Sequence, residues 1–451
     1  MKKVITYGSF DLFHEGHRSI LRRAREMGDS LIVGVTTEQY DVYRGKINLV
    51  DSLMRRIDNV RKTGLADEII VEDHEGQKAE DIQKYAIDLF VIGSDWRGQF
   101  DYLDQYCEVK YLDRTQNISS TDIRRGRQGF VLLGIAGTGR AAGRLAREIR
   151  FVSGVEARAA YNPSLESART FAGLYGIESA CDNYEAFLEK TDAVYIATPH
   201  ATHYDYARHA ILAGRHVLCE KPMTLSAQET RELFELANDC GVVLMEAVKT
   251  AYAPAFLNLL AVARCGRIGT VYDVECAFTK LIPEDKNARE YEPKTGGSFT
   301  ELASYSLLPI IKILGRDYRV EFRYFRGLNG CDIYAKALFA YDNATASAKT
   351  GIGVKSEGQL LISGTRGYIL ARSPWWLTKT FEVCYENPED NETFSGPFPG
   401  CGLRFEIADF TRNITDPNAR NYKFSREDSV AASGIIEQFL RERNGLWLKE
   451  P

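Results

Sequence analysis

Residues 130–149 read FVLLGIAGTGRAAGRLAREI: an apolar run, a glycine turn and an amphipathic helix pattern in immediate succession. Gly137, Gly139 and Ala142 have the spacing G-x-G-x-x-A. Glycines occur in many turns, so this spacing is weak evidence when taken alone. Its position gives it weight, because it follows a predicted strand and begins a predicted helix, as a dinucleotide-binding fold requires. The stretch therefore predicts the start of a doubly wound α/β domain.

The same succession of strand, turn and helix occurs at the start of the chain. Lys3–Tyr7 is a predicted strand, GSFDLFHEGH is the turn, and RSILRRAREMG follows with apolar residues at helical spacing. Further strands are expected at Ser30–Val35 and Asp88–Gly93 in this part, and at Glu156–Tyr161 and Asp192–Pro199 after the second turn. Strands that alternate with helices predict a parallel sheet in each part.

Beyond about residue 250 the pattern changes to alternating strands, among them TVYDVECAF, DIYAKALFAY and TASAKTGIGV, which predict a mainly antiparallel sheet. A last helix is expected at 425–445, where Ser425 and Asp428 suit a capping box and Gly445 a stop. The fold class is therefore α/β, with two Rossmann-like doubly wound parallel sheets and a C-terminal α+β domain. We expect the last helix to return to the second of three domains, which span 1–128, 129–250 and 251–451.

Composition and charge narrow the function. The 451 residues exceed what one hydrophobic core usually supports, so two or three domains are expected. The 57 Lys and Arg residues against 62 Asp and Glu residues give a net charge of −5, which argues against a dedicated nucleic-acid or membrane-surface binder. Nine scattered cysteines without a CxxC pair indicate reduced thiols. With no signal-peptide pattern and no long apolar run, we expect a soluble cytoplasmic protein without nucleic-acid or membrane partners.

Two histidines, His14 and His17, lie in the sequence HEGH just before the first predicted helix. A helix N-terminus presents unpaired N–H groups and binds phosphate. Two imidazoles there add donors that can hold an α-phosphate and stabilise the charge that develops at phosphorus. Gly16 permits a close approach of the backbone. Taken alone, the spacing would still favour two surface histidines that lie near a turn by chance.

The surrounding residues change that balance. The stretch YGSFDLFHEGHRSILRRAREMGD resembles the beginning of the glycerol-3-phosphate cytidylyltransferase family, within the wider HxGH nucleotidyltransferases. DLFVIGSDWRGQFDYL, CEVKYLDRT and ISSTDIRR follow in the same order, so the resemblance covers residues 1–126. It implies that the phosphate of a polyol phosphate attacks the α-phosphorus of CTP without a covalent intermediate, and that pyrophosphate leaves. Mg²⁺ would be held mainly by the nucleotide phosphates.

The resemblance also implies site residues. His14, His17 and Arg114 are the expected catalytic residues. In that family an arginine follows the loop that bears the lysine, which is Lys46 here. Both Arg55 and Arg56 are candidates for this arginine, and the distance to the segment DEI at 67–69 favours Arg56. The expected CTP contacts are Gly8, Ser9, Phe10, His14, Gly16, His17, Lys46, Arg56, Asp95, Arg114, Ile118, Ser119, Ser120 and Thr121.

The acceptor phosphate is expected to bind Arg44 and Lys78. Arg44 stands where the family pattern has a lysine, which keeps the charge and changes the geometry. The acceptor can therefore differ from glycerol 3-phosphate.

In the second half, residues 196–226 read IATPHATHYDYARHAILAGRHVLCEKPMTLS. This stretch resembles the glucose–fructose oxidoreductase and inositol dehydrogenase family, whose hallmark is Glu220-Lys221-Pro222, and the resemblance extends over about 130–451. It implies that Lys221 lies beside a nicotinamide and polarises the substrate oxygen, with a cis bond to Pro222. The expected cofactor contacts are Gly137, Thr138, Gly139, Arg140, Ala142, Asn162, Thr198, Pro199, His203, Glu220 and Lys221.

The expected cofactor is NADP or NAD. A dinucleotide fold commonly has a carboxylate near the end of its second strand, and Asn162 occupies that place here. Without this carboxylate there is no repulsion toward the 2′-phosphate of NADP(H), so the sequence is compatible with NADP(H). It lacks the acidic residue that would indicate NAD(H).

The proton-transfer residue of that family lies after a glycine pair, and GGSFTELASYSLL makes Tyr305 the candidate. A nearby Lys221 would lower the pKa of the phenol toward the working range. The alternative is a core tyrosine of an amphipathic helix. Glu301 replaces the family's Asp and Ala303 its Gly, which leaves open a different substrate or a lost activity.

Other residues give weaker signals. His200, His203, His209 and His216 are closely spaced, but the resemblance places them at a helix start and at packing positions, so no metal site is expected. We expect Trp375 and Trp376 to lie in the core or at the edge of a sheet, and not to form a surface on which a sugar stacks.

Together these patterns predict a bifunctional enzyme. Its first domain would make a CDP-polyol such as CDP-glycerol, and its second would transfer hydride on a carbonyl or polyol compound of the same pathway, which would feed a bacterial cell wall or capsule. The fusion motivates the link, because tethering raises the local concentration of a shared intermediate. One alternative is a cytidylyltransferase fused to a non-catalytic dinucleotide-binding module. Another is an oxidoreductase whose first domain tethers a CDP-linked substrate. Both families commonly form homo-oligomers, so a dimer or tetramer is expected.

Overall fold

The computed structural model describes residues 1–113 and 130–445. The chain divides into two compact units. The first contains Met1–Val131 and Ile149–Glu156, and the second contains Leu132–Glu148 and Ala157–Pro451. The domain boundaries at 128/129 and 250/251 stay predictions.

The first unit is built on a five-stranded sheet in which every strand pair is parallel. Its strands, in sheet order, are β3 (Glu68–Glu72), β2 (Ser30–Thr36), β1 (Lys3–Gly8), β4 (Leu89–Gly93) and β5 (Glu108–Leu112). Within its described residues, the helices are α1 (Glu15–Arg25), α2 (Glu38–Tyr43), α3 (Leu53–Arg61) and α4 (Gln77–Tyr85).

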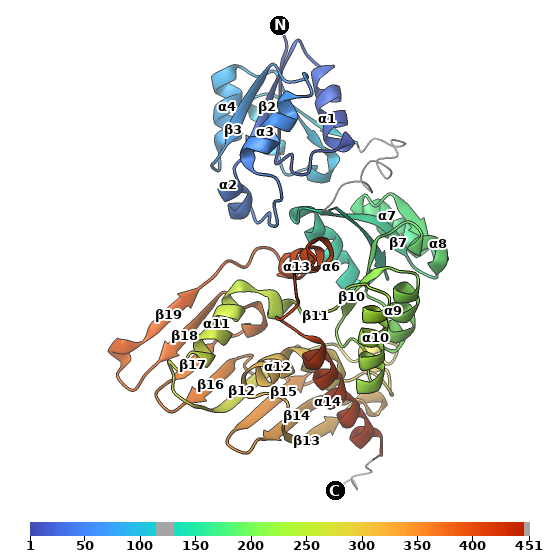
Figure 1. The fold of residues 1–451 in the computed structure, drawn as a ribbon, viewed down its shortest axis with the longest axis vertical. Helices are drawn as coiled ribbons and strands as arrows, with labels where there is room; N and C mark the ends of the chain where they lie inside the picture. Colours follow the sequence, from blue (N-terminus) through green and yellow to red (C-terminus); the bar gives the residue numbers. More distant parts are fainter. Residues whose placement is uncertain (114–129, 446–451) are drawn as a thin grey trace. The chain divides into compact units, whose positions relative to one another are not determined.

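Helices cover both faces of this sheet (Figure 1). Successive residues of β1 point to opposite faces, so Val4 and Ile5 belong to different cores. Val4 packs with residues of α1 and α3, among them Leu21 and Ile57. Ile5 packs with Ile82 of α4. The apolar pattern of the segment RSILRRAREMG thus forms the buried side of α1, as the sequence predicts.

The second unit contains a six-stranded parallel sheet with the strand order of a doubly wound dinucleotide fold. In sheet order its strands are β11 (Leu244–Ala247), β10 (His216–Glu220), β9 (Ala193–Ile196), β6 (Val131–Ala136), β7 (Val155–Tyr161) and β8 (Ser179–Cys181). The helices are α6 (Arg140–Glu148), α7 (Leu165–Tyr175), α8 (Tyr184–Leu188), α9 (His203–Leu212) and α10 (Ala227–Asp239). The carboxyl ends of β6, β9 and β10 lie at one edge, where ligands bind in such sheets.

An eight-stranded sheet completes the second unit. Its strands, in order, are β13 (Arg319–Arg326), β14 (Asp332–Ala340), β15 (Thr345–Gly351), β12 (Val271–Thr279), β16 (Leu360–Gly364), β17 (Tyr368–Ala371), β18 (Thr380–Cys384) and β19 (Glu392–Ser395). The pair β12–β15 is parallel and the other pairs are antiparallel. The predicted fold class, with two parallel sheets and a mainly antiparallel third, is therefore confirmed.

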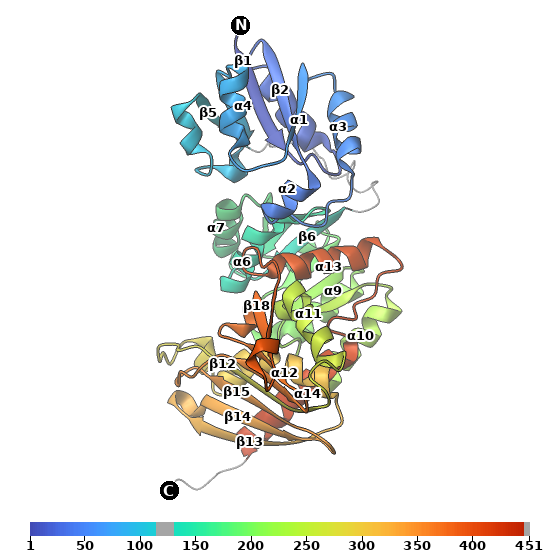
Figure 2. The ribbon, with the colours of Figure 1, turned by 90° about the vertical axis from the view of Figure 1, so that its left-hand side faces the viewer.

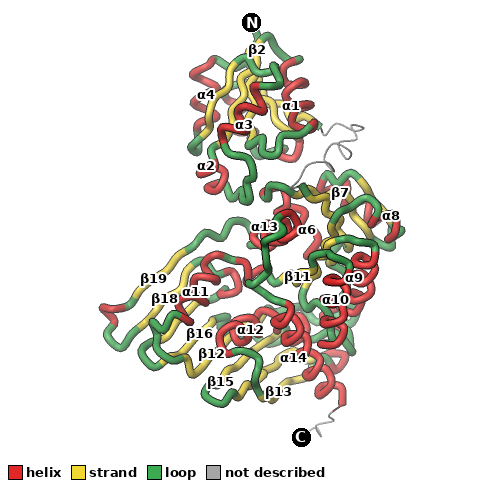
Figure 3. Tube along the Cα trace, in the orientation of Figure 1, coloured by secondary structure: helices red, strands yellow, loops and turns green. Residues whose placement is uncertain are grey.

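Four helices belong to this last part: α11 (Pro254–Arg264), α12 (Ser298–Leu314), α13 (Leu403–Thr415) and α14 (Arg426–Gly445). Helix α12 packs on β12, β14 and β15, and α11 packs on β18 (Figure 3). The N-terminus of α14 shows the predicted capping box, since Ser425 N donates to Asp428 Oδ2 at 2.9 Å and Asp428 N to Ser425 Oγ at 3.3 Å.

Helix α14 also lies along α10 of the six-stranded part (Figures 1 and 2). Thr230 Oγ1 donates to Ser433 Oγ at 2.8 Å, and Ala227 N donates to Glu437 Oε2 at 3.0 Å. In residues 1–113 and 130–445, no helix is long and apolar enough to cross a membrane.

Candidate active sites

The two histidines of the first unit lie at the N-terminus of α1 and hold each other in place. His14 is the N-cap residue, and its Nδ1 accepts a hydrogen bond from Gly16 N at 3.0 Å. His17 Nδ1 accepts from His14 N at 3.4 Å, and the two rings stack with centroids 3.9 Å apart. Because both Nδ1 atoms accept, the neutral rings carry their protons on Nε2. Two imidazoles therefore lie at the positive end of a helix, a location that suits a phosphate.

The loop between β1 and α1 is held in an unusual conformation by two carboxylates. Phe10 and Leu12 have φ angles of +51° and +45°, a left-handed region that non-glycine residues rarely occupy. The buried Asp11 carboxylate accepts from Asp51 N at 2.7 Å, and Asp51 Oδ2 accepts from Leu12 N at 3.1 Å. Such strain persists where the surroundings enforce it, and it clusters at functional sites.

Three predicted cations, Arg44, Lys46 and Lys78, belong to one electrostatic group. Lys46 Nζ donates to the Ser9 hydroxyl. This bond connects the lysine to residues 9–14, the loop between β1 and α1, which we call the histidine loop. Burial lowers the pKa of both Lys46 and Lys78, and the guanidinium of Arg44 contributes to lowering each. Nearby carboxylates oppose this, since Lys78 pairs with Glu72 and Arg44 Nη2 bonds Asp41 Oδ1 at 2.7 Å.

The structure shows what distinguishes Arg55 from Arg56. Arg56 is fully buried, and its guanidinium donates to the carbonyl oxygens of Ser9 and Thr36 at 2.8 Å and of Asp51 at 3.1 Å. Arg55 is 74% exposed. The described partners of Arg56 are protein groups, so its geometry is that of a residue that supports the loop, and its contact with CTP stays a prediction. Asp95 lies in a short 3₁₀ turn after β4. Arg114, Ile118, Ser119, Ser120 and Thr121 lie outside the described residues.

The glycine turn of the second unit fits a dinucleotide. Gly137 has φ +101°, and a Cβ there would lie 2.4 Å from the carbonyl oxygen of Ala197 at the end of β9. A Cβ on Gly139 would meet nothing within 4 Å, so space remains over the N-terminus of α6. Asn162 Nδ2 donates to Thr138 Oγ1 at 2.9 Å, so the residue in the acidic position is joined to the turn. This arrangement matches a phosphate turn at a helix N-terminus.

The Glu-Lys-Pro segment follows β10, and the Lys221–Pro222 bond is cis, as expected. Lys221 Nζ donates to the carbonyl oxygen of Glu301 in α12 at 2.7 Å. Glu220 accepts from the Tyr195 hydroxyl at 2.5 Å. The buried His203 ring lies between the carbonyl oxygens of Pro222, 2.9 Å from Nδ1, and Thr198, 3.0 Å from Nε2. It thereby joins the end of β9 to the lysine-bearing turn, which explains its position without a metal.

A buried ion pair fixes the start of α12. Asp332 Oδ2 accepts from Phe299 N at 2.8 Å, and its other oxygen pairs with Arg443 of α14 at 2.8 Å, with both side chains fully buried. Gly297 precedes the helix with φ +109°, and a Cβ there would collide with Asp332 Oδ1 at 2.0 Å. Gly297 is thus required by this capping carboxylate, which the sequence pattern alone did not indicate.

Glu301 and Tyr305 lie one turn apart on α12. The buried Glu301 carboxylate accepts from Arg289 Nη2 at 3.3 Å and lies 3.7 Å from His200 Nδ1. Burial, with His203 and Lys221 next in order, holds the pKa of His200 well below its usual value, so this ring is neutral near pH 7. His200 and Arg289 were missed as site residues, because their closeness to Glu301 depends on the packing of distant segments.

Tyr305 has the predicted neighbour and a different titration. Lys221 Nζ lies 5.5 Å from its ring centroid, and Phe278 packs against the ring at 5.3 Å. The expectation that the lysine lowers the phenol pKa is wrong: burial raises the pKa of Tyr305, and Glu220 and Glu406 raise it further. The neutral phenol is therefore the form present near pH 7.

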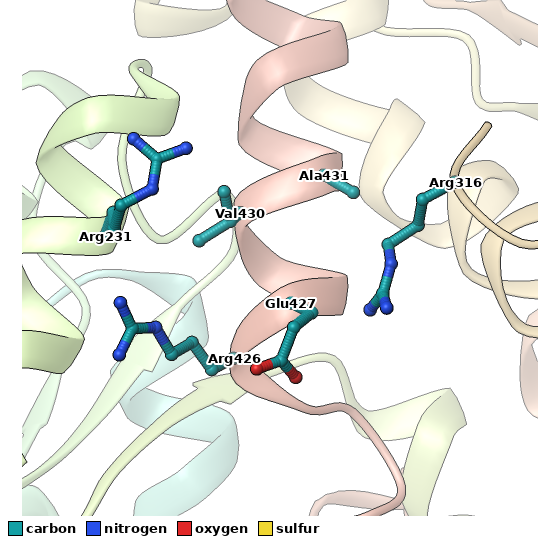
Figure 4. Close-up of a pocket in the computed structure, with 6 residues that line it drawn as sticks. All are labelled: Arg231, Arg316, Arg426, Glu427, Val430 and Ala431. Carbon is teal, nitrogen blue, oxygen red and sulfur yellow. The ribbon is translucent and has the colours of Figure 1, made fainter. Parts of the chain in front are cut away.

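One cavity of the second unit lies apart from these residues. A cavity of about 430 Å³ runs along α14 and is lined by side chains of α10, α14 and the segment after α12 (Figure 4). Its lining residues are Arg231, Arg316, Arg426, Glu427, Val430 and Ala431. Within the described chain, no group of three or more His, Cys, Asp or Glu side chains could hold a metal ion.

Two family models match the chain, one in each half. Residues 5–126 match the cytidylyltransferase-like family, and residues 131–248 match the oxidoreductase family with an NAD-binding Rossmann fold. The chain is a nucleotidyltransferase fused to an NAD(P)-dependent oxidoreductase. Its first part belongs to the glycerol-3-phosphate cytidylyltransferase family, and its second to the Gfo/Idh/MocA oxidoreductases.

Individual relatives agree with this division. The glycerol-3-phosphate cytidylyltransferase of Bacillus spizizenii is 50% identical over 125 residues, which cover 28% of this chain and 96% of that protein. The D-xylose 1-dehydrogenase (NADP(+)) 2 of Haloferax volcanii is 29% identical over 316 residues, 68% of this chain and 95% of that protein. A 3-ketoreductase structure from Actinomadura kijaniata, in complex with NADP and TDP-benzene, has a TM-score of 0.61 at 21% identity, with 68% of this chain and 96% of that one covered. This last likeness is one of fold.

Proposed function

We propose that the first domain transfers a cytidylyl group from CTP to a polyol phosphate, glycerol 3-phosphate or a related compound. A phosphate oxygen of the acceptor forms a bond to the α-phosphorus of CTP, the bond to the β-phosphate oxygen breaks, and pyrophosphate leaves. The observation that carries this proposal is the pair His14 and His17, which stack at the positive N-terminal end of α1 with their Nδ1 atoms accepting from backbone N–H groups.

The other residues have supporting parts in this proposal. Lys46, beside Ser9, would bind the triphosphate, and Arg44 with Lys78 would bind the acceptor phosphate. Mg²⁺ would be held mainly by the phosphates of CTP. The nearby Asp11 carboxylate is already used as an acceptor by the backbone N–H groups of Val50 and Asp51. The residues at 114–121 are proposed to complete the triphosphate site.

A direct assay tests the transferase proposal. The full chain is incubated with CTP, Mg²⁺ and glycerol 3-phosphate or other polyol phosphates, and pyrophosphate release is followed. His14→Asn keeps an acceptor for Gly16 N and removes the Nε2 donor, so we expect release to fall by about 10²–10³-fold while the helix cap is kept. No release with any polyol phosphate from wild-type protein would overturn the proposal.

For the second domain we propose NAD(P)-dependent hydride transfer on a carbonyl or polyol compound of the same pathway. The bound nicotinamide supplies or accepts the hydride. Lys221, held by the Glu301 carbonyl, would polarise the substrate oxygen, and the neutral Tyr305 hydroxyl would donate the proton to that oxygen in the reducing direction. The resulting charge would lie within reach of the Lys221 ammonium.

A screen of ketoses and ketose phosphates with NADPH and NADH tests this proposal. Tyr305→Phe keeps the ring that packs on Phe278 and removes the proton, so kcat should fall by about 10²-fold or more with little change in cofactor binding. Cofactor binding without turnover of any compound would instead favour the alternative of a non-catalytic dinucleotide-binding module.

A further inference from the structure

Five cationic side chains gather beside the redox residues, and we call them the cation cluster: Arg140, Arg144, Lys280, Arg289 and Lys355. Arg140 and Arg144 lie one turn apart on α6, so they share a face of that helix. Lys280 directly follows β12, and Lys355 Nζ donates to the carbonyl oxygen of Thr279, the preceding residue, at 3.1 Å. The cluster thus combines residues of α6 with residues from segments next to the eight-stranded sheet.

Ion pairs make the cation cluster continuous with the proposed reaction residues. Arg140 pairs with the buried Glu290, and Arg289 lies 4.0 Å from the same carboxylate. Arg289 also bonds Glu301 at 3.3 Å, and the Glu301 backbone carbonyl accepts from Lys221. A chain of contacts therefore leads from the dinucleotide turn to the catalytic lysine.

The register of β12 directs Lys280 toward the same face as Tyr305. Phe278 packs against the Tyr305 ring at 5.3 Å, and alternate residues of a strand point to one face, so residue 280 follows Phe278 on that face. The two positions are separated by about 7 Å along the strand. On its other side Phe278 stacks on Trp376 with centroids 3.7 Å apart. A substrate beside Tyr305 would therefore have an aromatic wall and, a few bond lengths away, an ammonium group.

The cations of this cluster outnumber the carboxylates that form ion pairs with them. The five cations of the cluster have two carboxylates among them, Glu290 and Glu301, in a chain whose net charge is −5. In the described residues, no carboxylate lies within 4.0 Å of Arg144 or Lys280. Burial lowers the pKa of Lys280, and the next two causes are Arg140 and Arg144, so these cations repel one another. An anion placed among them would relieve that repulsion.

We propose that the compound on which the redox domain acts carries a phosphoryl group, and that Lys280 and Arg144 bind that group. This inference rests on the proposed redox function and names its substrate class. A phosphoryl group offers several acceptor oxygens in different directions, which suits one cation on helix α6 and another at the end of β12, whereas a carboxylate offers two oxygens in one plane. The cofactor pyrophosphate would lie at the N-terminus of α6, one turn before Arg144 and on a different segment from Lys280.

The test compares matched substrates on the full chain with NADPH. Dihydroxyacetone phosphate is compared with dihydroxyacetone, and ribulose 5-phosphate with ribulose, while CDP-glycerol with NADP⁺ examines a phosphoryl group within a diphosphate. We expect kcat/KM for the preferred phosphorylated compound to exceed that of its unphosphorylated counterpart by at least 100-fold. Lys280→Gln and Arg144→Gln should each reduce this ratio at least tenfold, because each should raise KM for the phosphorylated compound. The control Lys286→Gln, an exposed lysine of the segment after Lys280, should leave the ratio unchanged.

Binding is measured in parallel by calorimetry, with NADP⁺ present and the same phosphate esters as probes. Binding of an ester that Lys280→Gln weakens at least tenfold supports the inference even if no compound is turned over, in which case the redox function alone fails. Three results overturn the inference: equal or better turnover of the unphosphorylated compounds, no binding of any phosphate ester, or a Lys280→Gln effect on the Kd of NADPH in place of the substrate.

Discussion

The Nζ atom of Lys221 lies 2.7 Å from the backbone carbonyl oxygen of Glu301. This hydrogen bond joins the turn after β10 to the first half of α12, so one contact fixes the lysine relative to both Glu301 and Tyr305. The carbonyl occupies one of the three ammonium donors, and two remain for other acceptors. The geometry therefore favours Lys221 as a fixed cation over a proton donor.

Removing that cation should abolish the redox chemistry while the fold remains. Lys221→Met keeps the length of the apolar stem, and we expect kcat to fall by about 10²–10³-fold on the best substrate of the screen. Single-turnover absorbance of NADPH measures the effect. Lys190→Met, at an exposed lysine of the same unit, serves as the control. A variant that retains more than half the wild-type rate would contradict the role given to Lys221.

Arg56 and Arg55 should differ sharply in their effect on stability. Arg56→Ala leaves three buried carbonyl oxygens without their donor, so we expect the first unit to lose about 3 kcal/mol or more of unfolding free energy. Arg55→Ala removes an exposed side chain and should change stability by less than about 0.5 kcal/mol. Urea unfolding followed by circular dichroism compares the two. Equal effects would show that Arg56 does not support the histidine loop.

Glu246 should make the stability of the second unit depend on pH. Burial raises the pKa of Glu246 from 4.5 to about 7, so the folded state binds a proton that the unfolded state releases above pH 4.5. Stability from this group is therefore fully present below pH 4.5 and is lost as pH rises to about 7, by about 3 kcal/mol in all.

Glu246→Gln keeps an acceptor for Met223 N and cannot ionise. The difference in unfolding free energy between this variant and the wild type should grow in favour of Gln as pH rises from 5 to 7 and then level off. Glu357→Gln, at an exposed position, should show a flat difference. A flat difference for Glu246→Gln as well would contradict the raised pKa.

The two ligands should stabilise different parts of the chain. A ligand that binds a folded unit raises the melting temperature of that unit by mass action. In differential scanning calorimetry we expect CTP with Mg²⁺ to move one transition and NADPH the other. His14→Asn should diminish the CTP shift and leave the NADPH shift intact. A single transition that both ligands move together would argue against independent binding domains.

The features that could be predicted from the sequence are those expressed by local spacing. The HEGH motif at a helix start, the Gly137 turn and the Glu-Lys-Pro segment each combine a few neighbouring residues with a known backbone geometry. The period of apolar residues likewise predicted both parallel sheets and the change to antiparallel strands.

What could not be predicted depends on residues far apart in the chain. The reciprocal contacts of Asp11 and Asp51, and the burial of Arg56, follow from the packing of α3 against the β1 loop. The pKa of Tyr305 was predicted with the wrong sign, because the sequence shows the nearby lysine and does not show the burial of the phenol or the nearby carboxylates of Glu220 and Glu406. Arg144 and Lys280 lie far apart in the chain, and the sequence does not show that the charge of one acts on the other.

The contact of Arg443 with Asp332 has a consequence for the order in which the two enzymes mature during synthesis. The carboxylate that caps α12 gains its counter-charge from α14, which follows every strand of both sheets in the second unit. On the ribosome the ion pair at the start of α12 can therefore form only after residue 443 has been synthesised, whereas the histidine loop and its supporting strands have emerged long before. We therefore expect the first unit to fold while the second is still being synthesised.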